Sequence, residues 1–227
     1  SADGRSIGFF ASNKLYRVEI AGGSPRVVAD APGSASGTWG ADGTILFAPP
    51  SGPVFRVPAE GGVPTAVTRL DPPREFRHSR PSFLPDGRRF LYYVDGAPSV
   101  TGIYLASLDG GEQRRLTDAA ETAGAYLPPG MVAWVQQGAL VARRLDLERG
   151  VLVGDSVTIA GSVSFYIPDH RGGVLVYAHD GVAYRLGGPS PSQLDWFGRP
   201  GEVVGAAGGA GPEYSPLSAP VPRGPPG

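Results

Sequence analysis

The side chains best suited to metal or acid–base chemistry in this sequence are three histidines, His78, His170 and His179. A zinc site needs several converging ligands, and no two of these histidines have the spacing of a known zinc motif. Cysteine is absent, which excludes thiolate metal sites, disulfides and cysteine nucleophiles. His179 directly precedes an Asp-Gly pair, where a solvated turn is expected. The sequence therefore predicts no metal site and no cofactor.

Two short charged clusters are candidates for binding rather than for catalysis. The first precedes an apolar, strand-like run, and the second lies between two such runs. The alternative for each cluster is an ordinary polar loop. We expect both clusters at the rim of the central channel, and the candidate binding residues are Arg77, His78, Arg80, Asp169, His170 and Arg171.

Other patterns that could suggest catalysis are better explained by structure. The segment 33–37 superficially resembles a nucleophile elbow, but its centre is Ala35 and no helical pattern follows. The arginine pairs at 88–89, 114–115 and 143–144 are far apart, and adjacent residues of a strand face opposite sides, so they form no continuous patch. No catalytic residue and no reaction are predicted.

The tryptophans and the recurring aspartates have structural explanations as well. Three tryptophans are expected to fill the core between sheets, and four aspartates precede glycines in turns rather than forming catalytic pairs. These residues are Trp39, Trp134, Trp196, Asp3, Asp42, Asp86 and Asp180.

Composition narrows the class of protein further. The chain has 227 residues, of which 35 are Gly and 24 are Pro, yet 41% are hydrophobic and the net charge is −1, unlike a disordered chain. With 20 basic and 21 acidic residues it lacks the charge excess of a nucleic-acid-binding domain. No apolar run is long enough to span a membrane. Arginine outnumbers lysine heavily, which indicates a GC-rich and therefore bacterial genome.

The glycines and prolines punctuate an internal repeat. Turn pairs end at Gly4, Gly43, Gly87, Gly130 and Gly181, so they recur roughly every 40–50 residues, a spacing typical of propeller blades. Each pair is followed by a short apolar run that is expected to form a strand. No segment has a convincing helical period; residues 140–150 come nearest, but they fall where a strand is due.

A second module follows each turn at a similar offset. A strand closed by two glycines and then a short outer strand recurs over 15–28, 54–68 and 103–117. We therefore predict an all-β propeller of four-stranded antiparallel blades. Five units are visible, and the first lacks its inner strand. The junctions between units are expected near residues 30–36, 70–78, 118–122 and 161–172. Residues 1–213 form the propeller domain and 214–227 a Pro/Gly-rich tail. Either the chain is a fragment of a propeller of six or more blades, or residues 214–218 supply the missing inner strand of a five-bladed ring.

These motifs resemble the TolB-like, WD-repeat-like bacterial propellers. The resemblance rests on Trp39 to Gly43, Phe83 to Arg88 and Ile103 to Thr117; the fourth unit departs from it, with Pro129-Gly130 in place of Asp-Gly. Within that family, Gly37-Thr38-Trp39 and Phe55 to Ala59 most resemble propellers attached C-terminally to bacterial serine/threonine protein kinases.

The resemblance implies a non-enzymatic module that binds a protein or small ligand at the rim of the propeller. It also implies a periplasmic or extracytoplasmic location and a role as the sensor arm of a kinase. Two alternatives belong to other classes of protein. One is the gating propeller of a prolyl-oligopeptidase-type serine hydrolase whose catalytic domain lies outside this chain. The other is a metal-dependent propeller enzyme such as a lactonase.

Overall fold

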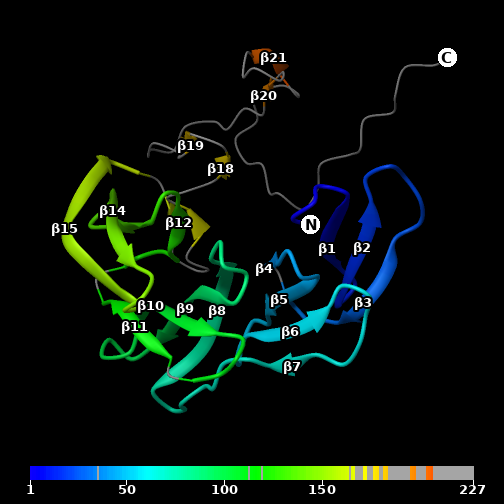
Figure 1. Cartoon of the computed structure of the whole chain (residues 1–227), viewed down its shortest axis with the longest axis horizontal. Coiled ribbons are helices and arrows are strands. Elements are labelled where there is room, and N and C mark those ends of the chain that lie inside the picture. Colours follow the sequence, from blue (N-terminus) through cyan, green and yellow to red (C-terminus); the bar gives the residue numbers. More distant parts are fainter. Residues whose placement is uncertain are drawn as a thin grey trace. The chain divides into compact units, whose positions relative to one another are not determined.

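The computed structural model describes residues 1–163 apart from 35, 112 and 119, and beyond them the backbone of short strands between 165 and 206. The chain divides into two compact units, Ser1–Leu186 and Gly187–Gly227. Every regular element in the described part of the chain is a strand, which confirms the all-β prediction, residues 140–150 included. Figure 1 shows these strands grouped into successive sheets along the chain.

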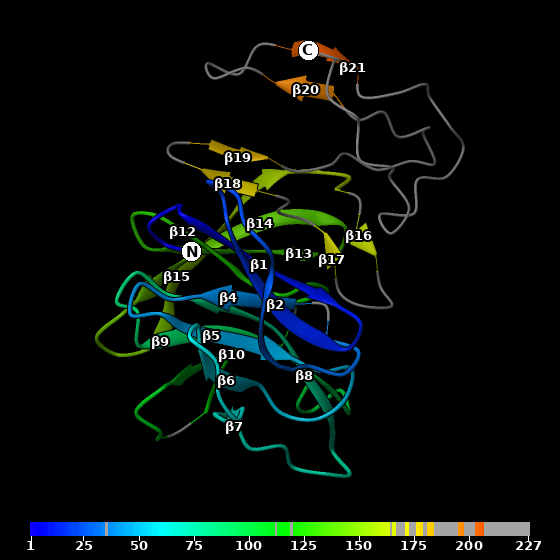
Figure 2. The same ribbon diagram turned by 90° about the vertical axis from the view of Figure 1, so that its right-hand side faces the viewer.

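The first unit contains one three-stranded sheet and three four-stranded sheets, each with its strands in chain order and antiparallel. Figure 2 shows this order clearly for β4 to β7. We call these sheets blades 1 to 4. Blade 1 is β1 (Ser6–Ala11), β2 (Lys14–Glu19) and β3 (Arg26–Asp30); blade 2 is β4 (Ser36–Trp39), β5 (Thr44–Ala48), β6 (Phe55–Pro58) and β7 (Thr65–Ala66); blade 3 is β8 (Glu75–Phe83), β9 (Arg89–Gly96), β10 (Gly102–Ser107) and β11 (Arg114–Thr117); blade 4 is β12 (Ala125–Leu127), β13 (Met131–Gln136), β14 (Ala139–Asp146) and β15 (Val151–Ala160).

The segment of the predicted fifth unit forms short antiparallel pairs. In the first unit of the chain, β16 (Phe165–Tyr166) pairs with β17 (Arg171–Gly172), and β18 (Val176–Ala178) pairs with β19 (Gly181–Ala183). In the second unit, β20 (Asp195–Phe197) pairs with β21 (Val203–Ala206). The tail 214–227 lies outside the described residues.

The Asp-Gly turns form for the reason that the sequence indicates. Gly4, Gly43 and Gly87 have φ values of 68°, 85° and 67°, in the left-handed region that glycine adopts without steric cost. The preceding aspartate closes the turn, as when Asp42 Oδ1 accepts a hydrogen bond from the backbone N–H of Thr44 at 2.9 Å. The fourth turn differs, because the Pro128–Pro129 peptide is cis and Gly130 has a φ of 128°.

The junction between blades 2 and 3 is shorter than predicted. β8 begins at Glu75, inside the stretch 70–78 that was expected to connect the blades. The early part of this strand pairs with β9 through Glu75 opposite Gly96 and Arg77 opposite Asp95. The sequence of this part of β8 is polar, so it does not indicate a strand. It pairs with the end of β9 that follows the apolar run of that strand.

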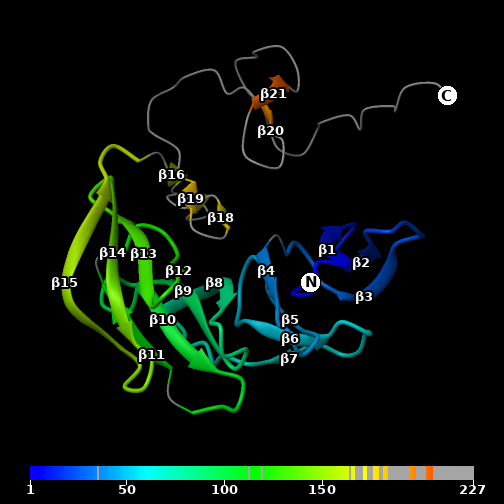
Figure 3. The same cartoon turned by 45° about the horizontal axis from the view of Figure 1, so that its top comes forward.

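The blades pack face to face, and each seam has its own apolar cluster. Leu15 of blade 1 packs in one cluster with Phe47 of blade 2, and Leu46 of blade 2 packs in another with Phe90 of blade 3. The seam between blades 3 and 4 joins Leu91 to Trp134. Figure 3 shows the four blades following one another in chain order. The adjacent residues Leu46 and Phe47 thus pack in opposite seams, because successive side chains of a strand point to opposite faces of the sheet.

Candidate functional site

The first predicted binding cluster lies within β8 rather than in a loop. Arg77 Nε donates to Asp95 Oδ2 on the neighbouring strand. Arg80 lies in a bulge between Ser79 and Ser82, has a φ of 54°, and its backbone N–H donates to Ser36 Oγ of blade 2 at 3.3 Å. The polar-loop alternative does not fit, because the ladder to β9 continues through this segment.

His78, the central residue of that cluster, is 1% exposed. Its ring lies 5.0 Å from the ring of Tyr92, centroid to centroid, within the seam between blades 2 and 3. The imidazole therefore faces the packed interior of the seam and not the solvent.

The second predicted cluster falls largely outside the described residues. This applies to Asp169 and His170, and His179 is outside them as well. Arg171 is described through its backbone alone, where it pairs with Tyr166 in β17 and β16. The role of these residues stays a prediction.

A chain of hydrogen bonds holds the buried imidazole in place. His78 Nε2 lies 3.1 Å from Glu75 Oε2, and Nδ1 lies 2.8 Å from Thr68 Oγ1. A carboxylate can only accept, so we assign the ring proton to Nε2, and Nδ1 then accepts from the Thr68 hydroxyl. The backbone N–H of Val54 donates to Thr68 Oγ1 at 2.8 Å. This network links β8 to Thr68, in the connection after β7, and to Val54, in the connection between β5 and β6.

Burial lowers the pKa of His78 below its ordinary value of 6.5, and the hydrogen bond and charge of Glu75 offset this only in part. The charged imidazolium is disfavoured because it would leave water for an apolar seam. His78 is therefore neutral at pH 7, in agreement with the assigned tautomer.

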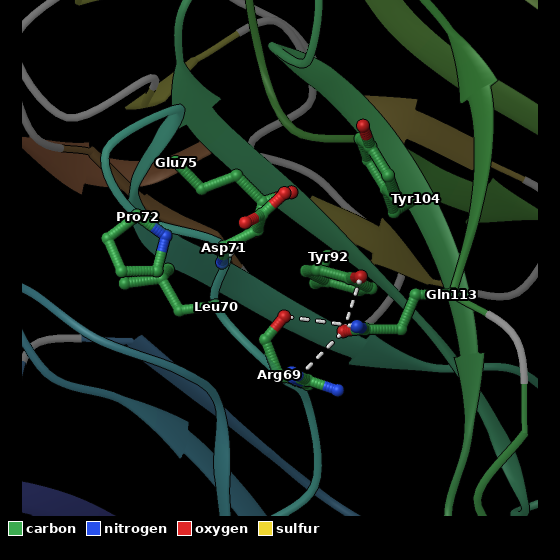
Figure 4. A pocket seen from close by; sticks show the side chains of 8 residues that line it. All are labelled: Arg69, Leu70, Asp71, Pro72, Glu75, Tyr92, Tyr104 and Gln113. Carbon is green, nitrogen blue, oxygen red and sulfur yellow. Dashed lines mark hydrogen bonds between the residues drawn. The ribbon is translucent and has the colours of Figure 1, made fainter.

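A polar pocket of about 600 Å³ adjoins this network, between the connection from β7 to β8 and the strands of blade 3. Glu75, Tyr92, Tyr104 and Gln113 form its walls together with residues 69–72. Figure 4 shows the carboxylates of Asp71 and Glu75 on one side and Gln113 with Arg69 on another. The volume is within the range of small-ligand sites.

One glutamine bridges the two blades at the edge of the pocket. Gln113 Oε1 accepts from the Tyr92 hydroxyl at 3.0 Å and from the backbone N–H of Arg69 at 3.1 Å. Gln113 Nε2 donates to the Arg69 carbonyl at 3.1 Å. These bonds, drawn in Figure 4, fix the connection after β7 against the outer part of blade 3.

The hydroxyl, imidazole and carboxylate of Thr68, His78 and Glu75 follow the order of a nucleophilic triad. The Thr68 side chain is buried, however, and its oxygen already holds the Val54 N–H and the imidazole. No substrate carbonyl could approach this hydroxyl without opening the seam. We therefore interpret the network as the support of the pocket wall.

The tryptophans and the turn aspartates have the structural roles that the sequence predicts, as far as the structure describes them. Trp134 is buried in the seam between blades 3 and 4, and Trp39 packs partly buried against blade 1, which confirms their core role; the side chain of Trp196 is outside the described residues. Asp3 and Asp86 accept backbone N–H groups in their turns, as predicted.

The arginine pairs contact different parts of the surface rather than one patch. Arg88 pairs with Asp109, Arg114 donates to the Arg149 carbonyl, and Arg143 donates to the Gly154 carbonyl. Within the described residues, no group of three potential metal ligands converges, and no helix is long and apolar enough to cross a membrane.

Sequence reasoning missed most of the pocket. Tyr92 and Tyr104 stood in predicted strands without a further role, and Gln113 followed a glycine turn without any signal. These residues meet because the blades stack, and no local spacing in the sequence encodes that contact. Glu75, three residues before His78, was the one available hint.

Comparison with known proteins supports the fold. No family model and no curated protein matches the sequence. Among solved structures, the chain is similar to a protein from Agrobacterium tumefaciens provisionally named TolB, with 22% identity and a TM-score of 0.55. The match covers 74% of this chain and 62% of that one, so the chain spans less than two thirds of the solved protein. The similarity confirms the β-propeller fold.

Proposed function

We propose that this chain is a non-enzymatic binding module that acts as the extracytoplasmic sensor arm of a bacterial serine/threonine kinase. The observation that carries the binding role is the polar pocket at the seam between blades 2 and 3. Its walls come from strands and from a connection fixed by the Gln113 and His78 hydrogen bonds. Polar groups held on a rigid frame suit recognition of a ligand, as is common for loops on propeller scaffolds.

Support for the kinase connection comes from the sequence motifs around Trp39 and Phe55, which resemble kinase-associated propellers. In such an arrangement the propeller would bind its ligand outside the membrane. Arg77, Arg80 and the second cluster, Asp169 to Arg171, remain candidate contacts for a protein partner.

The kinase proposal is tested by reading the DNA on both sides of this coding segment. We expect an upstream kinase domain followed by one membrane-spanning helix. A downstream hydrolase domain with a Gly-x-Ser-x-Gly motif would overturn the proposal in favour of a gating propeller. A signal peptide followed by further blades alone would overturn the kinase connection and make the protein a periplasmic scaffold.

A further inference from the structure

The pocket between blades 2 and 3 exposes mainly hydrogen-bond acceptors. Both hydrogen bonds to the Glu75 carboxylate within the described residues fall on Oε2, from His78 and from the backbone N–H of Asp71 at 2.8 Å. Oε1 is therefore left to accept from a ligand. Asp71 likewise binds Arg74 through Oδ2, which leaves Oδ1 as an acceptor at the mouth of the pocket.

The two phenol groups in the wall already donate their protons elsewhere. The Tyr92 hydroxyl donates to Gln113 Oε1, and the Tyr104 hydroxyl donates to the Val100 carbonyl at 2.8 Å. Toward a ligand, each oxygen can therefore offer lone pairs and not a proton. Burial raises the pKa of both phenols, and the charge of Glu75 raises it further. At Tyr104 the charges of Arg115 and Arg74 oppose this rise.

The same tyrosines line the pocket, where Tyr104 is 9% exposed and Tyr92 is 1% exposed. Their rings are 5.6 Å apart between centroids and inclined at 43°, and both side chains are largely buried. An aromatic face attracts a cation through the ring quadrupole, more strongly when the site is shielded from water. Aromatic faces beside carboxylates match an organic cation better than a metal ion, which requires oxygen ligands on all sides.

Positive groups near the pocket do not cancel this character. Arg69 is exposed, and in Figure 4 its guanidinium lies on the Gln113 side of the pocket, away from the two carboxylates. Arg74 is not part of the wall; it forms an ion pair with Asp71, and its charge also acts on Glu75 and Tyr104, as the charge of Arg115 acts on Tyr104. Glu75, with a side chain 11% exposed, is the most shielded charge that faces the cavity.

We infer that this pocket binds the cationic end of an alkylammonium or alkylguanidinium group, with Glu75 Oε1 as its principal acceptor. This inference rests on the proposed binding function and names its ligand chemistry. The group could belong to a small amine or to a lysine or arginine side chain of a partner protein. In either case the cation donates to Glu75 and Asp71, and its alkyl part lies against Tyr92 and Tyr104.

The test is an NMR titration of the whole chain with butylguanidinium, butylammonium, butanol and butyrate. We expect saturable shifts of the Gln113 side-chain amide and of the backbone amides of 69–75 with the two cations alone. Acetyl-Ala-Arg-Ala-amide and acetyl-Ala-Lys-Ala-amide form a second arm. If a peptide binds more tightly than the butyl cations, the ligand is a side chain of a protein partner. If the affinities are equal, the ligand is a small amine. Both results support the inference.

Substitutions identify the acceptors. Glu75→Gln retains an oxygen that can accept from His78 and Asp71, so the wall should persist while affinity for butylguanidinium falls at least about tenfold. Asp71→Asn, at an exposed position, should weaken binding only about two- to fivefold. Glu60→Gln is the matched control: it removes one negative charge from an exposed pair with Arg17 and should leave the affinity unchanged.

Three results would overturn the inference: equal shifts with butanol and the cations, binding of Ca²⁺ without binding of the cations, or unchanged affinity in Glu75→Gln. An unchanged amide spectrum of that variant before titration shows that the fold is intact. Failure here would leave the kinase connection untouched, because that connection depends on the neighbouring domains and not on this pocket.

Discussion

Two seams of this propeller are built from opposite faces of the same sheet, and they differ in chemistry. On β9, Tyr92 faces blade 2 and Tyr93 faces blade 4. The Tyr93 hydroxyl donates to the Ala120 carbonyl at 2.9 Å inside an apolar cluster. The Tyr92 hydroxyl instead donates to Gln113 beside a polar pocket. One seam is packed for stability, whereas the other combines packing with a supported cavity.

The largest loss of stability is expected in the apolar seam. Leu91 is fully buried between blades 3 and 4, so Leu91→Ala should lower the free energy of unfolding by about 2–5 kcal/mol through lost contacts and a cavity. Guanidinium-induced unfolding measures this change. Val63→Ala, at an exposed position, is the control and should change stability by less than about 0.5 kcal/mol. A loss that small for Leu91→Ala would show that this seam does not hold the blades together.

In the polar seam, His78 supplies the corresponding test. His78→Leu keeps the volume but removes the partners of the Thr68 hydroxyl and of Glu75 Oε2. The Thr68 hydroxyl then has no acceptor and Glu75 Oε2 keeps only the Asp71 N–H, so the free energy of unfolding should fall by about 1–3 kcal/mol. The same unfolding experiment measures it. A more stable variant would mean that the network contributes no support and that apolar packing alone is sufficient.

Lowering the pH should reduce the free energy of unfolding through His78 in the polar seam. The pKa of His78 is lowered in the folded state from its ordinary 6.5, so the unfolded chain takes up the proton first as the pH falls. The contribution of the neutral imidazole is complete above about pH 6.5 and declines below it, by at most about 1.4 kcal/mol per pH unit. Unfolding curves between pH 7.5 and 5 measure this slope. His78→Gln should flatten it, and an identical slope in that variant would contradict the assignment.

The smallest expected difference is between the losses of stability caused by Tyr93→Phe and Tyr92→Phe. Tyr93→Phe leaves the buried Ala120 carbonyl without this donor and should lower the free energy of unfolding by about 1–2 kcal/mol. Tyr92→Phe should have an effect below about 1 kcal/mol, because Gln113 Oε1 still accepts from the Arg69 N–H. Equal losses in the two variants would remove the distinction between the seams.

The sequence was sufficient for the fold because its signals are local. Asp42-Gly43 and Asp86-Gly87 each encode a turn between neighbouring strands, and the apolar runs after them have the period of a strand. The same logic failed at β8, where Glu75 to His78 looks like a polar loop and pairs with β9 nevertheless.

The site was harder to predict because its parts are distant in the chain. Gln113 reaches Arg69 across 44 residues, and Tyr104 lies beside Tyr92 only because β10 pairs with β9. His78 was correctly noticed but was expected at a solvated rim. Its burial follows from the packing of blade 3 on blade 2, which depends on contacts between repeats rather than on the sequence around the histidine.

The most direct test of the difference between the seams is a crystal structure of the chain with butylguanidinium. We expect the guanidinium between blades 2 and 3, within hydrogen-bonding distance of Glu75 Oε1 and against the rings of Tyr92 and Tyr104. His78 should still be hydrogen-bonded to Thr68 and Glu75. A cation bound elsewhere, with the pocket beside Glu75 holding water alone, would contradict it.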